Sequence, residues 1–199
     1  MSGESRPLVC VACSIFRDEM ERLQAQEQTD LPVRFLGSML HMVPERLEQR
    51  LKAAVQEELA KGHDVLLAYG DCCPHMVDIE EGDGVGRTGG INCCEILLGR
   101  EAYRRLRREG VFFLMPEWTL NWKAVFRDTL GLHDENARHF MRDMHTRLVY
   151  LDTGLIRVPE EELTEIAQFT GLPVERMQVS LDPLLASLRD AAERILGHE

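Results

Sequence analysis

Six cysteines are the residues of this chain whose type and spacing could do chemistry. Cys13 and Cys72 each follow a predicted strand, and Cys93 lies at the start of a predicted helix, where the helix dipole favours a thiolate. Thiolates are the ligands that zinc and iron–sulfur clusters prefer. Three of them, gathered from separate loops, would leave one coordination position open for water or substrate. The sequence therefore predicts a metal centre, Zn²⁺ or a [4Fe–4S] cluster, on these cysteines.

The remaining cysteines are interpreted differently. Cys10 lies within a predicted strand, where a small apolar side chain is expected in the core. Cys73 and Cys94 are the neighbours of two predicted ligands, and either could replace its neighbour on the metal. All the cysteines could instead be small buried residues, and the two vicinal pairs also admit a redox thiol protein. The spacing is not the CxxC…CxxC of a structural zinc site.

Polar and aromatic side chains follow the same predicted strand ends. Asp71 or Glu117 is expected to transfer a proton, and His41 to orient the substrate, while the open metal position polarises substrate or water. The predicted substrate-binding residues are Arg87, Trp118, Asp152 and Thr153. Three of them also have a structural interpretation. His41 could be a structural histidine and Arg87 a solvated arginine. Trp118, with Trp122 four residues later, could form a stripe of core side chains. No GxSxG motif indicates a serine hydrolase.

Short apolar segments alternate with helical patterns along the chain. The predicted strands cover residues 7–13, 32–40, 64–69, 110–115 and 147–152. Such alternation is typical of an α/β fold: a mostly parallel, doubly wound sheet of about five strands, with helices on both faces and a helical C-terminal part. Ligands bind beyond the carboxyl ends of such strands. We expect a single domain over residues 1–199, with 132–146 and 155–199 as mainly helical additions.

A glycine-rich segment separates the third predicted strand from the next helix. Residues 70–92 contain five glycines between Gly82 and Gly90. Long loops inside compact domains are often functional, so we expect a flexible lid or substrate loop. Its sequence is not the GxxxxGK[ST] of a phosphate-binding loop, nor a GxGxxG that opens directly from a strand. Arg87 within it could hold a carboxylate.

Composition narrows the classes of partner. The 199 residues are 44% hydrophobic and 29% charged, with a formal net charge of −11. Such an acidic chain is a poor partner for nucleic acid or an anionic membrane. The segment Met1–Arg6 is polar, and no apolar stretch approaches the ~20 residues that span a bilayer. We expect a cytoplasmic protein, whose thiols stay reduced.

Ordered motifs along nearly the whole chain resemble an uncharacterised prokaryotic family, the domain of unknown function 1638. They are Ala12-Cys13, Leu40-His41 with Pro44, Tyr69-Gly70-Asp71-Cys72, Asn92-Cys93-Cys94-Glu95, Leu114 with Pro116 and Trp118, and Tyr150-Leu151-Asp152-Thr153-Gly154. The resemblance implies an α/β fold with cysteines at the positions of Cys13, Cys72 and Cys93. The chain departs from the family pattern at Asn92, where a histidine is frequent, and at Cys73, where a glycine is frequent.

The resemblance also implies a metabolic setting. Many members of the family are encoded beside corrinoid-dependent methyltransferase systems for methylated amines, which suggests one-carbon metabolism. We therefore expect a metalloenzyme acting on a small polar metabolite. The alternative is a non-catalytic binding or accessory protein, with a corrinoid or methyltransferase partner and closed metal coordination or a flat apolar patch. The sequence leaves open the metal, the ligating cysteine of each pair and whether the protein is a homo-oligomer.

Overall fold

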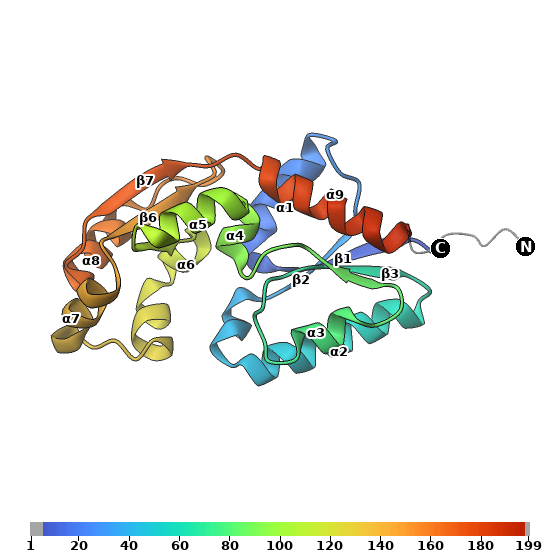
Figure 1. Cartoon of the computed structure of the whole chain (residues 1–199), viewed down its shortest axis with the longest axis horizontal. Coiled ribbons are helices and arrows are strands. Elements are labelled where there is room, and N and C mark those ends of the chain that lie inside the picture. The colour runs from blue at the N-terminus through green and yellow to red at the C-terminus, as the bar shows by residue number, and fades with distance from the viewer. Residues whose placement is uncertain (1–5, 198–199) are drawn as a thin grey trace, which may run out of the picture. The chain divides into compact units, whose positions relative to one another are not determined.

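The computed structural model describes residues 6–197 (Figure 1). They fall into two compact units, bounded as Met1–Leu97 with Leu181–Glu199 and as Leu98–Ser180. We describe each unit by itself, and the expected single domain over 1–199 stays a prediction. Apart from Arg6, the polar segment 1–6 lies outside the described residues, as do the last two positions of that domain. No helix within 6–197 has the length and apolar character needed to cross a membrane.

The first unit is built on a four-stranded parallel sheet. Its strands are β1 (Leu8–Cys13), β2 (Val33–Leu36), β3 (Asp64–Ala68) and β4 (Val85–Arg87), in the order β2-β1-β3-β4. All residues of β3 are buried, as its continuous apolar run predicts for a strand covered on both faces. Because every pairing is parallel, the residues that follow the four strands meet at one edge of the sheet.

Helices cover both faces of this sheet. They are α1 (Arg17–Ala25), α2 (Pro44–Ala60), α3 (Met76–Glu80), α4 (Cys93–Leu98) and α9 (Asp182–Leu196), with 3₁₀ turns at Ser14–Phe16 and Ser38–Met42. Figure 1 shows α1 and α9 on one side of the strands and α2 and α3 on the other. Pro44 begins α2, where its missing N–H costs nothing, and Leu47 and Leu51 lie on the buried face.

The glycine-rich segment is not the structureless lid that we expected. It contains α3 and the edge strand β4, which pairs with β3. A Cβ at Gly86 would lie 2.5 Å from Cγ1 of Ile195, so only glycine lets α9 pack this closely on β4. Gly86, one of the glycines that made this segment look like a loop, is needed because α9 packs closely on β4.

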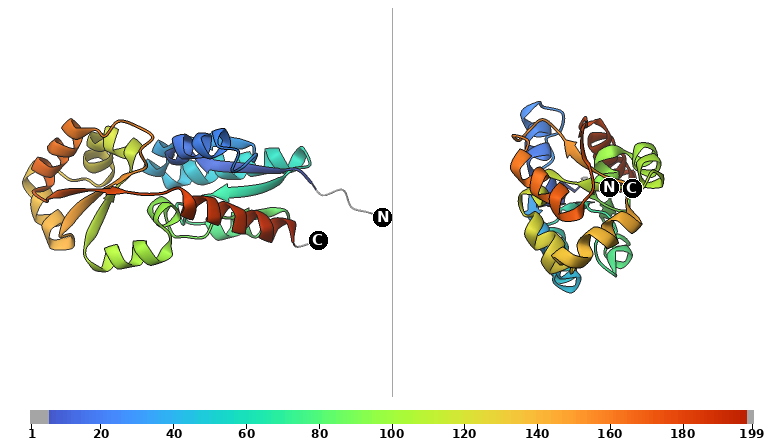
Figure 2. Two further views of the ribbon diagram at one scale, coloured as in Figure 1. Left: turned by 90° about the horizontal axis from the view of Figure 1, so that it is seen from above. Right: turned by 90° about the vertical axis from the view of Figure 1, so that its left-hand side faces the viewer.

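The second unit contains a three-stranded parallel sheet in the order β5-β6-β7. Its strands are β5 (Val111–Leu114), β6 (Arg147–Asp152) and β7 (Val174–Gln178), and its helices are α5 (Arg100–Arg108), α6 (Pro116–Leu120), a π-helical turn (Ala124–Thr129), α7 (Asp134–Met144) and α8 (Glu160–Thr170). α7 packs against α8, as Figures 1 and 2 show. The core of this unit includes Trp122, Phe126 and Phe169, whose ring centroids lie 5.3–6.2 Å apart.

The α/β class and the parallel pairing are confirmed, and the C-terminal part is mainly helical, as expected, although it also contains β7. Two details differ from the prediction. The described strands form two sheets rather than one, and β4 and β7 are additional to the five predicted strands. The predicted helix that starts at Cys93 is interrupted at Gly99, whose φ of +78° is incompatible with a continuous helix. Trp122 is 4% exposed and therefore lies in the core, in agreement with the interpretation of this tryptophan as a core residue.

A buried carboxylate ties α2 to the sheet of the first unit. Glu58 is 5% exposed, and its oxygens lie 2.8 Å from Lys61 Nζ, 3.0 Å from His63 Nδ1 and 3.2 Å from Arg34 Nη1 of β2. The hydrogen bonds from Lys61 and His63 lower the pKa of Glu58 from 4.5 to about 2. A carboxylate with a lowered pKa stabilises the fold above its unfolded pKa, and this contribution is lost as the pH falls towards the folded pKa.

Replacing this carboxylate tests the assignment. Glu58→Gln should lower the free energy of unfolding by about 1–2 kcal/mol at pH 7, a figure reduced for solvent screening. The difference from wild type should shrink between pH 4.5 and about pH 2, where the wild-type carboxylate becomes protonated. Urea denaturation at a series of pH values measures it. Glu57→Gln, which removes an exposed carboxylate 2.7 Å from the same arginine, is the control. A difference that persists unchanged at pH 2 would contradict the assignment.

Candidate functional site

The three predicted metal ligands lie at the carboxyl edge of the four-stranded sheet. Cys13 is the last residue of β1, Cys72 follows β3 by four residues, and Cys93 begins the helix after β4. Cys13 is 3% exposed, whereas Cys72 and Cys93 are partly exposed. All six cysteines are thiols rather than disulfides, and Cys10 is fully buried in β1, as predicted. The topology therefore brings the three thiols to one edge.

A close backbone contact joins the loop of Cys72 to that of Cys93. A Cβ at Gly70 would lie 2.5 Å from the backbone N and Cα of Asn92 and from the carbonyl carbon of Ile91. The Asp71 N–H donates a hydrogen bond of 2.9 Å to the Ile91 carbonyl. Only a residue without a side chain fits at this contact.

The first turn of α4 is held by its own polar residues. Asn92 Oδ1 accepts the Glu95 N–H at 2.9 Å, and Glu95 Oε2 accepts the Ile91 N–H at 3.1 Å. This arrangement resembles a capping box, with the carboxylate reaching back beyond the cap residue. Asn92 thus acts as the helix cap. It fixes the position from which Cys93 and Cys94 project.

The thiols of Cys72 and Cys93 have raised pKa values and stay protonated at neutral pH. Burial raises the pKa of Cys72 to about 12, and the nearby Cys93 adds to the shift. A hydrogen bond with the Cys94 thiol, followed by burial, raises the pKa of Cys93 well above 9.0. The sequence argument that a helix N-terminus favours a thiolate at Cys93 is outweighed here, because α4 is short and the neighbouring thiol and burial both favour the neutral form.

Tyr69 lies among these cysteines. Its side chain is 1% exposed, and its hydroxyl has no hydrogen-bond partner among the described residues. Burial raises the pKa of this hydroxyl. Because Ala12 of β1 pairs with Ala68 of β3, Cys13 and Tyr69 are the next residues along two adjacent parallel strands. Sequence reasoning did not select Tyr69; its place in the motif Tyr69-Gly70-Asp71-Cys72 was the available signal.

His41 lies against Tyr69 at the same edge. The two rings are stacked, with centroids 6.3 Å apart and planes inclined by 18°. The Nδ1 of His41 is 2.8 Å from the Ser38 carbonyl, which can only accept, so the proton of the neutral ring sits on Nδ1. The Ser38 N–H donates to Ser14 Oγ at 2.8 Å and connects the loops after β2 and β1. His41 is thus brought close to the cysteine cluster.

The predicted anion-binding arginine is engaged by carboxylates of the chain. Arg87 Nη1 is 2.8 Å from Asp71 Oδ1, Arg87 Nε is 2.8 Å from Glu80 Oε2, and the arginine side chain is 13% exposed. The ion pair ties β4 to the loop of Cys72. These contacts give Arg87 a structural role. The substrate role of Arg87 and the proton-transfer role of Asp71 stay predictions.

The other four predicted site residues belong to the second unit. Glu117 and Trp118 are partly exposed on α6, and Asp152 and Thr153 follow one another at the end of β6. Asp152 is 1% exposed. Its oxygens accept hydrogen bonds from the Gly154 N–H at 2.8 Å, from Arg176 Nε at 2.6 Å and from the Gln178 amide. These bonds link β6 to β7 and satisfy the buried carboxylate within the chain.

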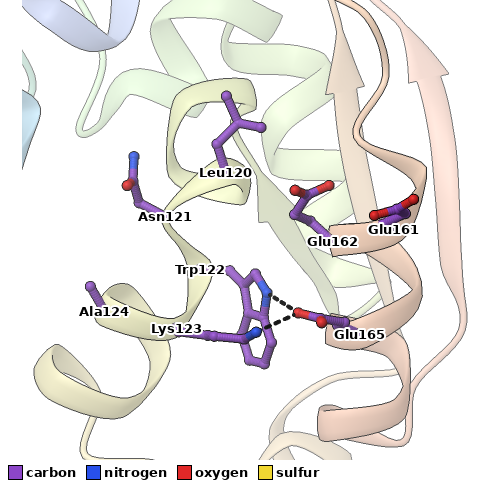
Figure 3. A pocket seen from close by; sticks show the side chains of 8 residues that line it. All are labelled: Leu120, Asn121, Trp122, Lys123, Ala124, Glu161, Glu162 and Glu165. Carbon is purple, nitrogen blue, oxygen red and sulfur yellow. Dashed lines mark hydrogen bonds and ion pairs between the residues drawn. The ribbon is translucent and has the colours of Figure 1, made fainter.

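A hollow that the sequence did not predict lies between the end of α6 and α8 in the second unit (Figure 3). It encloses about 410 Å³. Glu165 Oε2 accepts the Trp122 indole N–H at 3.1 Å and lies 2.8 Å from Lys123 Nζ. The main polar groups of the hollow thus satisfy one another, so the arrangement joins α8 to the chain after α6.

Within residues 6–197, no group of three histidine, cysteine, aspartate or glutamate side chains is arranged as it stands to hold a metal ion. Rotation about Cα–Cβ moves a cysteine sulfur without moving the backbone. The backbone places Cys13, Cys72 and Cys93 at one edge of the sheet, and metal coordination by them stays a prediction.

Comparison with known protein families identifies the family of this chain. Residues 35–188 match the family described as protein of unknown function (DUF1638). The chain belongs to this family. The match includes His41, Tyr69, Cys72 and Cys93 and confirms the resemblance to this family, whereas the Ala12-Cys13 motif lies outside the matched residues. No curated protein and no solved structure matches the chain.

The contact at Gly70 yields a prediction about the site. Gly70→Ala should lower the free energy of unfolding by about 1–3 kcal/mol, because the added methyl group must displace the Ile91–Asn92 backbone. It should also speed the reaction of Cys72 with a thiol reagent in the folded protein. Urea denaturation and labelling rates measure both. Gly37→Ala is the matched control, since Gly37 has a φ of −61° and open space around its Cα. Equal effects of the two substitutions would contradict the steric argument.

Proposed function

We propose that this protein is a metalloprotein that uses Cys13, Cys72 and Cys93 to hold a thiophilic metal centre, Zn²⁺ or a [4Fe–4S] cluster, and acts on a small polar metabolite. The observation that carries the proposal is the Gly70 contact, which brings the loops of Cys72 and Cys93 together at the edge where β1 ends in Cys13. An open α/β sheet binds its ligands at this edge.

The donor chemistry fits such a centre. Thiolates select zinc and iron–sulfur clusters over hard cations, and the electrostatic coupling of Cys72 with Cys93 indicates that their sulfurs are near one another. Because the thiols are protonated without a cation, metal binding would release protons. Cys94, hydrogen-bonded to Cys93, and Cys73, 7% exposed, remain the alternate ligands.

The chain's own residues would handle the substrate around an open coordination position. When bound, the metal would supply Lewis-acid chemistry, polarising a substrate oxygen or a water. His41, whose Nδ1 lies 2.8 Å from the Ser38 carbonyl and whose ring stacks on Tyr69, is the candidate for orienting the substrate. Glu117 and Asp71 remain the acids proposed for proton transfer. An accessory role beside a corrinoid methyltransferase is the alternative, and closed four-thiolate coordination would favour it.

Metal analysis tests the proposal. Protein purified without oxygen should carry about one zinc per chain, or the iron and sulfide of one cluster, and an absorption spectrum separates the brown cluster from colourless zinc. Cys72→Ala and Cys93→Ala should each lower the metal content by at least about tenfold. Cys10→Ala is the control, because Cys10 is buried within β1. A folded wild-type protein with less than about a tenth of an equivalent of metal, which does not take up added Zn²⁺ or a reconstituted cluster, would refute the proposal.

A further inference from the structure

The buried hydroxyl of Tyr69 is the polar group in the cysteine cluster that the rest of the structure leaves unexplained. It is shielded from water, since the residue is 1% exposed, and no described residue accepts or donates a hydrogen bond to it. An unpartnered buried hydroxyl is unfavourable, and native proteins usually satisfy such groups. A tyrosine in place of phenylalanine at this position is therefore explained by a partner that forms when the site is in use.

The surroundings of the hydroxyl indicate what that partner is. Ala12 of β1 pairs with Ala68 of β3, so Cys13 and Tyr69 are the next residues along two adjacent parallel strands, and Cys72 follows Tyr69 by three residues. A neutral thiol is a weak hydrogen-bond acceptor, whereas a metal-bound thiolate is negatively charged and a much better one. Because burial keeps the phenol protonated, the hydroxyl can only donate to a thiolate.

We propose that Tyr69 is a positioning residue whose hydroxyl donates a hydrogen bond to the Cys13 thiolate once that sulfur ligates a metal. This inference rests on the proposed metal centre and adds a residue to it. Hydrogen bonds to ligating atoms orient them and tune the metal's properties. The ring is already fixed by burial and by stacking on His41, so the donor needs little reorganisation to meet the sulfur. The cost of an unpartnered hydroxyl in the absence of metal is recovered when metal binds.

Tyr69→Phe tests the inference, because it removes one hydroxyl and leaves the ring. Without metal, the variant should unfold at the same temperature as wild type or higher, since it loses only an unpartnered polar group. With Zn²⁺ as the probe, its dissociation constant, measured by competition with a chromophoric chelator, should rise about tenfold with unchanged stoichiometry. Tyr103→Phe is the control: Tyr103 is 6% exposed and stacks on Phe113 in the second unit. It should leave the zinc affinity unchanged.

A spectroscopic readout separates a hydrogen bond to sulfur from a general loss of stability. In protein loaded with Co²⁺, the thiolate-to-cobalt charge-transfer band of Tyr69→Phe should move to lower energy, because a sulfur without its hydrogen bond gives up an electron more easily. Wild type and Tyr69→Phe binding zinc equally well, with identical cobalt bands, would overturn the role of Tyr69 and leave the metal centre standing. Failure of wild type itself to bind zinc, cobalt or a cluster would overturn the proposed function, and this inference with it.

Discussion

The contact of Gly70 with the Ile91–Asn92 backbone is the constraint on which the cysteine-bearing edge depends. It fixes the separation of two loops that leave neighbouring strands, and the Asp71–Ile91 hydrogen bond holds them there. The ion pairs of Arg87 with Asp71 and Glu80 hold the outer loop to β4, and the Asn92–Glu95 cap holds the start of α4. Backbone packing thus positions the side chains proposed to carry the chemistry.

Electrostatics at this edge favours the neutral thiols of Cys72 and Cys93. Burial and the neighbouring sulfurs raise the pKa values of both, so these two thiols carry little charge in a poorly solvated place. A divalent ion or cluster would reverse that preference by stabilising the thiolates. The same surroundings that suppress reactivity in isolation would strengthen binding, because water competes less for the charges.

The sequence predicted the strands best where apolar runs were continuous, as in β1, β3 and β6, because burial on both faces leaves a clear pattern. It missed β4, in which Gly86 is dictated by the approach of Ile195 from the far end of the chain, and β7, which is short and largely polar. It gathered the cysteines correctly at one sheet edge, since parallel topology requires it. It could not detect the pairing of Arg87 or the unpartnered hydroxyl of Tyr69, because both depend on side-chain neighbours that are distant in sequence.

Helix α9 packs on the first unit although it follows the second unit in the sequence, and this order affects folding during synthesis. The second unit, Leu98–Ser180, is inserted between the strands of the first and the helix that packs on β3 and β4. During synthesis the four-stranded sheet therefore lacks the cover of α9 until residues 182–196 have been added, while the inserted segment can already fold. The apolar face beneath α9 is the surface of the nascent protein that would need a chaperone's protection.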